Sequence, residues 1–113
     1  MDDDDSAEAL LAWAVRSRRV VTASYTGSGR AGVRVLYPHV LYRSIPGELL
    51  LEVFQVDGPT GSGRLPDWRV FKVSGLRDIE VQTAVFLPLP QLDLRAPRYG
   101  RRVVAHCLEE EPS

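Results

Sequence analysis

The stretch from Arg34 to Phe71 decides the fold of this chain. It begins with Arg34-Val-Leu-Tyr-Pro-His-Val-Leu41, continues after a turn with Glu48-Leu-Leu-Leu-Glu-Val-Phe54, and ends after a loop with Trp68-Arg-Val-Phe71. Apolar and polar residues mix along the three segments, and turn residues separate them, which indicates short strands. Each segment also carries an arginine, a histidine or an aromatic residue that a small core does not need. The stretch therefore predicts one face of a small β domain, and a ligand-binding role for that face.

The flanking segments extend this pattern to a mainly β chain with one helix. Ser6 is a suitable helix N-cap, and apolar residues at helical spacing follow it, so we expect a helix over Ala7–Arg18. Alternation and turn residues predict strands at Val20–Tyr25, Val33–Tyr37, Glu48–Val56, Trp68–Val73 and Ile79–Phe86. Pro38 is expected to stop the second strand, because proline cannot donate to a ladder. This plan is typical of a small SH3-like or Sm-like bent antiparallel barrel, with the helix packed across one opening.

The length and the ends of the chain predict a single domain. The 113 residues are enough for one domain and too few for two. We expect one domain over residues 6–108, with a C-terminal extension from about residue 87, where prolines break regular structure and a last short strand can follow. Residues 1–5 and 109–113 are acidic and are expected to be disordered. A single cysteine, no long apolar run and no signal-peptide pattern predict a cytoplasmic protein without a membrane partner.

The net charge of −1 conceals an uneven distribution of charge. Asp2 to Asp5 and Glu109 to Glu111 carry seven of the 15 acidic residues, so eight remain against 14 basic residues, a body of about +6. Thirteen of the basic residues are arginine, which suits bidentate recognition of phosphate or carboxylate. A GC-rich genome would explain the preference for arginine equally well. The charge of the body predicts an anionic partner.

The order of these motifs resembles the WYL domain over about Ala7 to Phe86. The matching features are a helix that ends in Arg-Ser-Arg-Arg-Val-Val-Thr-Ala-Ser-Tyr25, then Arg34-x-x-x-Pro38-x-x-Leu41, a hairpin into a Leu-rich strand, and Arg69-Val-Phe71 before Gly-Leu-Arg-Asp-Ile. The resemblance implies an SH3-like, Sm-like sensor domain. WYL domains usually follow a DNA-binding helix-turn-helix in bacterial transcription regulators. Because no room for that motif precedes Ser6, we expect a stand-alone WYL-like protein or a fragment of a longer one.

Two positions depart from the family pattern. The strand that usually reads Trp-Tyr-Leu has Leu49-Leu50-Leu51 here, and Gly75 stands where the family usually has an arginine. Both departures concern the strands and turn around the family's ligand site. They favour an alternative function, a structural protein-interaction or oligomerisation domain with a degenerate site.

The candidate ligand-binding residues each have a plain structural alternative. The resemblance implies a basic, aromatic face that binds nucleic acid or a nucleotide-like ligand. The positions of this chain that it places on that face are Tyr25, Arg34, His39, Arg69 and Phe71. Arg34 and Arg69 could instead be solvent-facing strand charges, His39 an ordinary surface residue, and Tyr25 a core residue. Regular alternation places Phe71 on the same side of its strand as Arg69, so Phe71 should line the site if Arg69 does.

A second basic and aromatic cluster follows near the C-terminus. It consists of Arg98, Tyr99, Arg101 and Arg102, and it suits either nucleic-acid contact or a solvated tail.

The sequence does not support catalysis. His39 and His106 are the two histidines, and with one cysteine they do not make a zinc site of the usual type in one chain. No nucleophile-elbow, P-loop or zinc-protease motif is present, so we expect a non-enzymatic module without a cofactor. The expected partners are single-stranded nucleic acid or a nucleotide-like ligand, a second copy in a homodimer, and in the alternative another protein. The homodimer is expected because a barrel this small leaves Trp13, Tyr37, Tyr42 and the segment Leu87–Leu94 hard to bury in one chain.

Overall fold

The computed structural model describes residues 3–26, 32–60, 64–100 and 102–108 as one helix and a six-stranded sheet. The elements follow in the order α1 (Asp3–Arg16), β1 (Arg19–Tyr25), β2 (Arg34–Arg43), β3 (Leu49–Asp57), β4 (Asp67–Lys72), η1 (Val73–Gly75), β5 (Leu76–Val85) and β6 (Val103–His106). Every strand pair is antiparallel. The predicted mainly β class with one N-terminal helix is confirmed, and the predicted turn after β4 is the short 3-10 segment η1.

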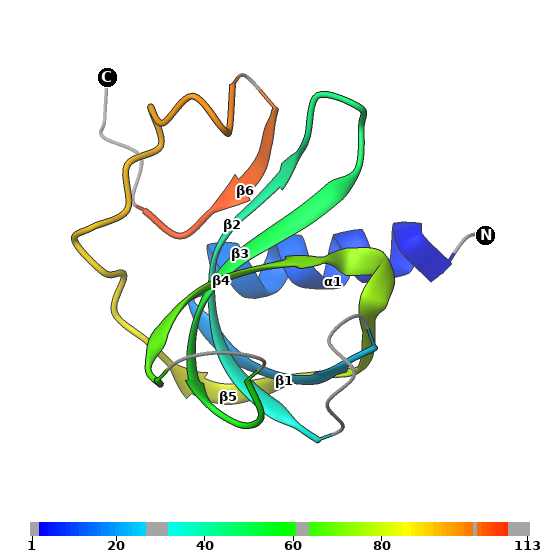
Figure 1. The fold of residues 1–113 in the computed structure, drawn as a ribbon, viewed down its shortest axis with the longest axis vertical. Helices are drawn as coiled ribbons and strands as arrows, with labels where there is room; N and C mark the ends of the chain where they lie inside the picture. The colour runs from blue at the N-terminus through cyan, green and yellow to red at the C-terminus, as the bar shows by residue number, and fades with distance from the viewer. Residues whose placement is uncertain (1–2, 27–31, 61–63, 101, 109–113) are drawn as a thin grey trace.

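The sheet runs in the order β4-β3-β2-β1-β5, and β6 pairs with the second half of β2. The strands curve around a core, and α1 crosses behind them in the view of Figure 1. Leu11, Ala14 and Val15 of the helix are fully buried in that core. Among the described residues the pairings form an open path from β4 to β5, so closure into a barrel stays a prediction.

The second strand is longer than predicted. Pro38, which was expected to stop the strand, lies inside it. β2 continues from Arg34 to Arg43, and Pro38 pairs with Val53 while Val40 pairs with Glu52. His39 is therefore the extra residue of a β-bulge, an irregularity at which a strand accommodates a proline. The continuation of β2 beyond the bulge provides the edge to which β6 pairs.

The helix is displaced toward the N-terminus relative to the prediction. It spans Asp3–Arg16 instead of Ala7–Arg18, so Ser6 is not its N-cap. Acidic residues in a first turn interact favourably with the positive end of the helix dipole. At the other end Arg18 has a φ of 56°, a left-handed conformation that does not continue a helix. Residues 1–2 and 109–113, at the ends predicted to be disordered, lie outside the described part.

The chain after β5 covers the outer face of the sheet. Alternation along β3 directs Leu51 and Val53 into the core and Glu52 to the opposite side. Glu52 is nevertheless only 5% exposed, because the C-terminal extension packs over it and buries Leu92 and Tyr99. Figure 1 shows this extension, from yellow to orange, passing along one side of the sheet before it enters β6. The two faces of β3 therefore meet different parts of the chain.

Candidate functional site

Two arginines lie on the inner face of the sheet, on either side of β3. Arg34 is on β2 and Arg69 on β4, the two neighbours of β3. The guanidinium carbon of Arg34 lies 5.4 Å from the ring centroid of Phe71 and 6.0 Å from that of Tyr25. The two rings are 4.7 Å apart and tilted by 59°. We call Tyr25, Arg34, Gln55, Arg69 and Phe71 the arginine cluster.

Arg34 is a buried cation, and its contacts include an amide and two aromatic rings. It is 2% exposed, and its Nη1 donates to Oε1 of Gln55 at 3.3 Å. Burial lowers the pKa of Arg34, and the positive charge of Arg69 lowers it further. An arginine nevertheless stays protonated at any physiological pH. The arrangement therefore keeps two like charges close together in a partly desolvated place.

Arg69 is the more accessible of the two arginines, with 21% of its side chain exposed. Its guanidinium donates to Oδ2 of Asp67, to Oγ1 of Thr60 and to the carbonyl oxygen of Trp68, each at about 3 Å. The hydrogen bond from Arg69 holds the pKa of the Asp67 carboxyl below its usual value. Asp67 itself is exposed, so an anion from solvent can compete with it for Arg69.

Gly75 is a glycine because the ring of Tyr25 occupies the space beside it. A Cβ atom on Gly75 would lie 2.6 Å from Cε1 of Tyr25, far inside van der Waals contact. The departure from the family's arginine at this turn is thus linked to the position of Tyr25 in the arginine cluster. At the other departure, Leu51 is fully buried, and Leu49 and Leu50 pack partly buried against the core.

His39 lies inside the domain rather than on the exposed face where the sequence prediction placed it. Its side chain is fully buried, and its ring contacts Trp68 at 4.8 Å and Phe86 at 5.0 Å between centroids. Nδ1 lies 2.7 Å from the carbonyl oxygen of Tyr37, and Nε2 accepts the backbone N–H of Leu89 at 3.1 Å. A backbone N–H can only donate, so the proton of the neutral ring is on Nδ1. Burial lowers the pKa of His39, and the residue attaches the C-terminal extension to the bulge of β2.

Two residues of the predicted second basic cluster, Arg98 and Tyr99, attach the C-terminal extension to β3. Arg98 forms two hydrogen bonds of 3.1 Å to the two carboxylate oxygens of Glu52, and the Tyr99 hydroxyl donates to Glu52 Oε1 at 2.8 Å. Tyr99 is fully buried, and the guanidinium of Arg98 lies 4.6 Å from its ring centroid. Burial raises the pKa of Tyr99, and the hydrogen bond to Glu52 raises that of Arg98. Arg102 is exposed, and Arg101 lies outside the described residues.

Sequence reasoning missed the polar partners on β3. Gln55 and Glu52 are buried polar residues within an apolar strand, one on each face of the sheet. Buried polar groups require hydrogen-bond partners. A glutamine and a glutamate within a predicted core strand could therefore have indicated that polar partners lie on both faces of β3. Gln55 also donates to the carbonyl oxygens of Asp57 and Pro59, and so holds the start of the loop beside Arg34.

Three further observations concern other kinds of site. Burial raises the pKa of the Cys107 thiol to about 11, so the thiol is protonated and a poor nucleophile at neutral pH. The described part of the chain contains no group of three or more histidine, cysteine, aspartate or glutamate side chains placed to hold a metal ion. Within the same residues, no helix has the length and apolar character to cross a membrane.

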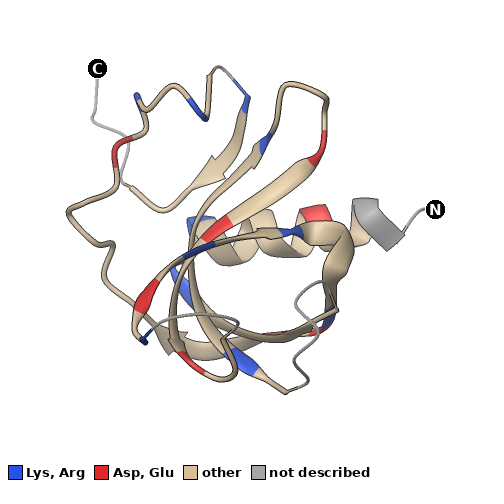
Figure 2. Ribbon diagram, viewed as in Figure 1, with Lys and Arg blue, Asp and Glu red and all other residues tan. Residues whose placement is uncertain are grey.

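The basic residues are spread over the whole domain rather than collected in one patch. Figure 2 shows lysine and arginine on the helix, on several strands and along the C-terminal extension, with acidic residues between them. The net charge of the body is therefore a general feature, whereas the arginine cluster is distinguished by a buried arginine over two aromatic rings with the charge of Arg69 nearby.

Comparison with known proteins gives a likeness of fold alone. No protein-family model and no curated protein sequence matches this chain. Among solved structures, the domain is similar to part of proteasome accessory factor B/C (PafBC) of Arthrobacter aurescens, with a TM-score of 0.64 and 24% sequence identity. The similarity covers 80% of this chain but only 14% of that protein. The chain thus has the fold of a small part of a much longer protein.

Proposed function

We propose that this chain is a WYL-like, non-enzymatic ligand-sensing module that binds a phosphate-bearing ligand, a nucleotide or single-stranded nucleic acid, at the arginine cluster. The observation that carries the proposal is the placement of two arginines on the inner face of the sheet: Arg34 lies over the rings of Tyr25 and Phe71, and the charge of Arg69 lowers the pKa of Arg34. The order of helix, strands and turn also agrees with the order that the resemblance to WYL domains implies.

The electrostatics of the cluster favour an anion. Two like charges held close together in a place of reduced solvation repel each other, and a bound anion relieves that repulsion. Arg69 is the contact residue, since its guanidinium reaches solvent and bonds an exposed carboxylate that phosphate oxygens can replace. Arg34 contributes positive potential from behind, held by Gln55 and the two rings. Tyr25 is partly exposed and offers an aromatic surface to the same ligand.

The test is the affinity for a fluorescent single-stranded oligonucleotide, measured by anisotropy over a range of salt concentrations. We expect binding that weakens as salt rises, because neutralised phosphates release counterions. Arg69→Ala should weaken binding of every sequence about equally and make the salt dependence less steep. The matched control is Arg95→Ala, which also removes one arginine paired to an aspartate but whose side chain is 94% exposed. Equal affinity of the Arg69 and Arg95 variants would place the site elsewhere.

A second candidate function is an interaction domain that forms a homodimer, for which exposed apolar side chains supply the reason. Trp13 is 47%, Val85 68% and Leu87 85% exposed. Trp13 and Val85 lie on either side of Arg19, whose guanidinium is 5.1 Å from the Trp13 ring centroid and whose backbone pairs with Val85. Two of the apolar residues that motivated the predicted homodimer, Tyr42 and Leu92, are buried within the chain and do not support it. The remaining surface still suits a second copy.

A further inference from the structure

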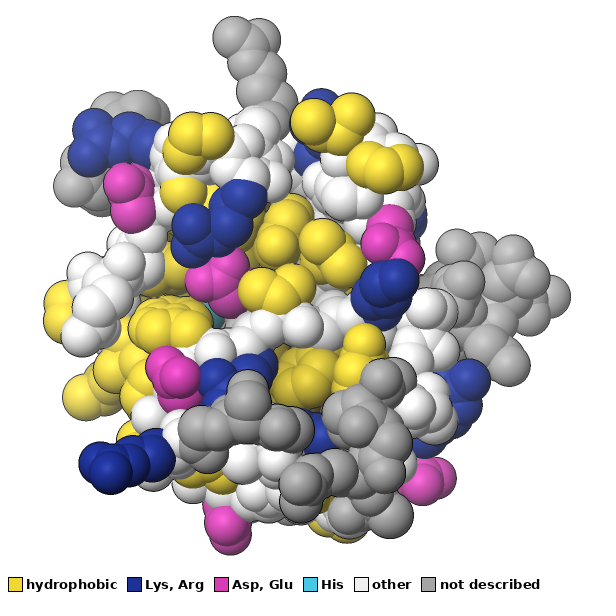
Figure 3. Space-filling view, in the orientation of Figure 1, with side chains coloured by type: hydrophobic (Ala, Val, Ile, Leu, Met, Phe, Trp, Pro, Cys, Tyr) yellow, Lys and Arg dark blue, Asp and Glu magenta, His cyan; other side chains and the backbone are white. Residues whose placement is uncertain are grey.

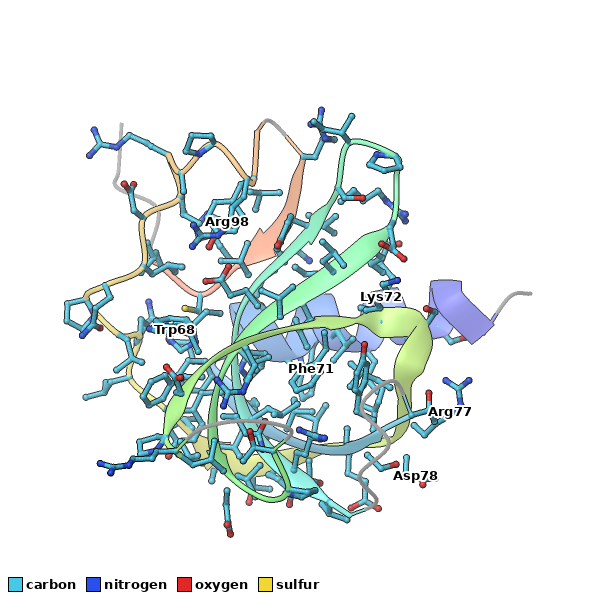
Figure 4. All side chains as sticks on the ribbon, viewed as in Figure 1. Trp68, Phe71, Lys72, Arg77, Asp78 and Arg98 are labelled. Atoms are coloured by element: carbon cyan, nitrogen blue, oxygen red, sulfur yellow. The ribbon has the colours of Figure 1, made fainter. Side chains whose placement is uncertain are left out.

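A hollow of about 420 Å³ lies on the outer face of the sheet, away from the arginine cluster. Its lining residues are Glu52 from β3, Trp68 from β4, and Gln91, Leu92 and Arg98 from the C-terminal extension. We call it the Trp68 hollow. Figure 4 shows Trp68 and Arg98 on the same side of the molecule, Trp68 on β4 and Arg98 on the extension above it. Figure 3 shows that apolar side chains and charged side chains lie next to each other on this face. The volume is in the range of small-ligand sites.

The aromatic wall of the hollow is held in place by its neighbours. The Trp68 ring meets His39 at 4.8 Å and 70° and Phe54 at 5.5 Å and 68°, so both neighbours meet it at a steep angle rather than stacked. His39 is itself fixed by hydrogen bonds at both ring nitrogens: Nδ1 donates to the Tyr37 carbonyl oxygen, and Nε2 accepts the Leu89 N–H. Trp68 remains partly exposed although its orientation is fixed. A fixed and partly exposed indole is a good surface for stacking a planar ring.

The polar lining of the hollow suits the edge of a heteroaromatic ring. The Gln91 amide is exposed and offers both donors and an acceptor. Glu52 accepts three hydrogen bonds, two from Arg98 and one from Tyr99, and a carboxylate has about four acceptor sites. The Arg98 side chain is 53% exposed, which leaves its planar guanidinium partly accessible. Stacking together with mixed donors and acceptors is how proteins recognise unpaired bases.

We infer that the Trp68 hollow binds a nucleobase, stacked on Trp68 and hydrogen-bonded at its edge by Gln91. This inference rests on the proposed function for the rest of the ligand, whose phosphate contacts Arg69. Trp68 and Arg69 are consecutive residues on opposite faces of β4. β4 is the terminal strand of the sheet path formed by the described residues, so a nucleotide chain passes around its edge from one face to the other. The preferred ligand is therefore single-stranded nucleic acid rather than a simple phosphate.

The experiment uses the fluorescence of Trp68. The chain has two tryptophans, so Trp13→Phe leaves Trp68 as the single reporter in the otherwise complete protein. Adenosine, which has a base and no phosphate, should quench this fluorescence saturably, whereas ribose 5-phosphate, which has no base, should not. Gln91→Ala should weaken adenosine binding by about 2- to 12-fold, the effect of one hydrogen bond. Gln82→Ala makes the same change on β5, where the amide bonds Thr22, and should leave the titration unchanged.

The outcomes separate this inference from the proposed function. Adenosine that gives no saturable quenching, or an oligonucleotide that binds by anisotropy without changing Trp68 fluorescence, overturns the base site and leaves the phosphate site standing. Saturable quenching by adenosine together with an Arg69→Ala variant of unchanged oligonucleotide affinity supports the base site and contradicts the phosphate site. Absence of both signals overturns both.

Discussion

Alanine substitutions at Gly58 and Gly47 distinguish the cost of backbone strain from the cost of a steric clash. Both have positive φ, +104° at Gly58 and +97° at Gly47. A Cβ on Gly58 would lie 2.5 Å from the Val33 carbonyl oxygen, whereas among the described residues nothing lies within 4 Å of a Cβ on Gly47. We expect Gly47→Ala to cost about 1 kcal/mol from φ alone. Gly58→Ala should cost about 1–3 kcal/mol more. Urea denaturation measures both, and equal costs would contradict the clash.

Gly58 also matters for the arginine cluster, because its Cβ would approach the Cα of Arg34 at 2.7 Å. The loop after β3 therefore needs a glycine for the backbone to pass close to the start of β2. A Gly58→Ala protein that still folds should show weaker oligonucleotide binding than Gly47→Ala, since Arg34 has to move.

His39 predicts a dependence of stability on pH. Burial lowers its pKa in the folded state below the unfolded value of about 6.5, so unfolding takes up a proton in the window between the two values. Stability is therefore complete above about pH 6.5 and decreases as pH falls below it. His39→Gln cannot titrate, and its unfolding free energy should change less between pH 8 and 5.5. If the unfolding free energy of the His39→Gln protein falls as much as that of the wild type between pH 8 and 5.5, other groups cause the pH dependence.

At the scale of elements, the sequence predicted the strands well because alternation and turn residues are local signals. The predicted strand at Val20–Tyr25 became β1, Arg19–Tyr25, and Glu48–Val56 became β3, Leu49–Asp57. The ends of the helix and the length of β2 were wrong. The bulge at His39 accommodates Pro38, and its position depends on pairing with β3 and β6, which is not a local property.

The candidate site was predictable in part for the same reason. Period-two alternation placed Arg69 on the side of Phe71, and the family motif added Arg34, but the sequence did not indicate Gln55 as the hydrogen-bond partner of Arg34. The sequence did not predict the contacts of His39 and Arg98, because their partners, Leu89 and Glu52, are about 50 residues away in the chain. Nothing local indicates that a proline-rich extension returns over the sheet and buries them.

The extension is attached to the sheet by Glu52, which yields a third prediction. Arg98→Ala leaves a 5% exposed carboxylate with Tyr99 as its described hydrogen-bond donor. Loss of one partner of a fully buried pair costs about 3–5 kcal/mol, and the partial exposure of Arg98 reduces our expectation to about 2–3 kcal/mol. Arg95→Ala removes an exposed pair and should stay within about 0.5 kcal/mol. Thermal or urea unfolding compares the two, and similar stabilities would mean that water replaces Arg98 at little cost.

On the scale of the whole molecule, the sheet separates two kinds of surface. Its inner face holds the arginine cluster, and its outer face holds the C-terminal extension and the Trp68 hollow. The terminal strand β4 contributes Arg69 to the first and Trp68 to the second. Because the two sites lie on opposite faces of β4, we expect affinity to rise with oligonucleotide length before it levels off.

The last prediction concerns assembly through the exposed apolar surface near the end of α1. Trp13 is half-exposed, and Val85 and Leu87 follow at the end of β5, where the Phe86 N–H bonds the Arg18 carbonyl oxygen. Burying these side chains against a second copy would remove apolar area from water. We expect a dimer whose mass by light scattering falls toward that of the monomer on dilution.

Trp13→Arg should shift this transition to higher concentration, because it places a charge in the interface. Val70→Arg makes a similar change at a 49% exposed residue on β4 and should leave the dimer intact. A monomeric mass at every concentration would remove assembly from the functions of this domain. Loss of the dimer in Val70→Arg but not in Trp13→Arg would place the interface at β4.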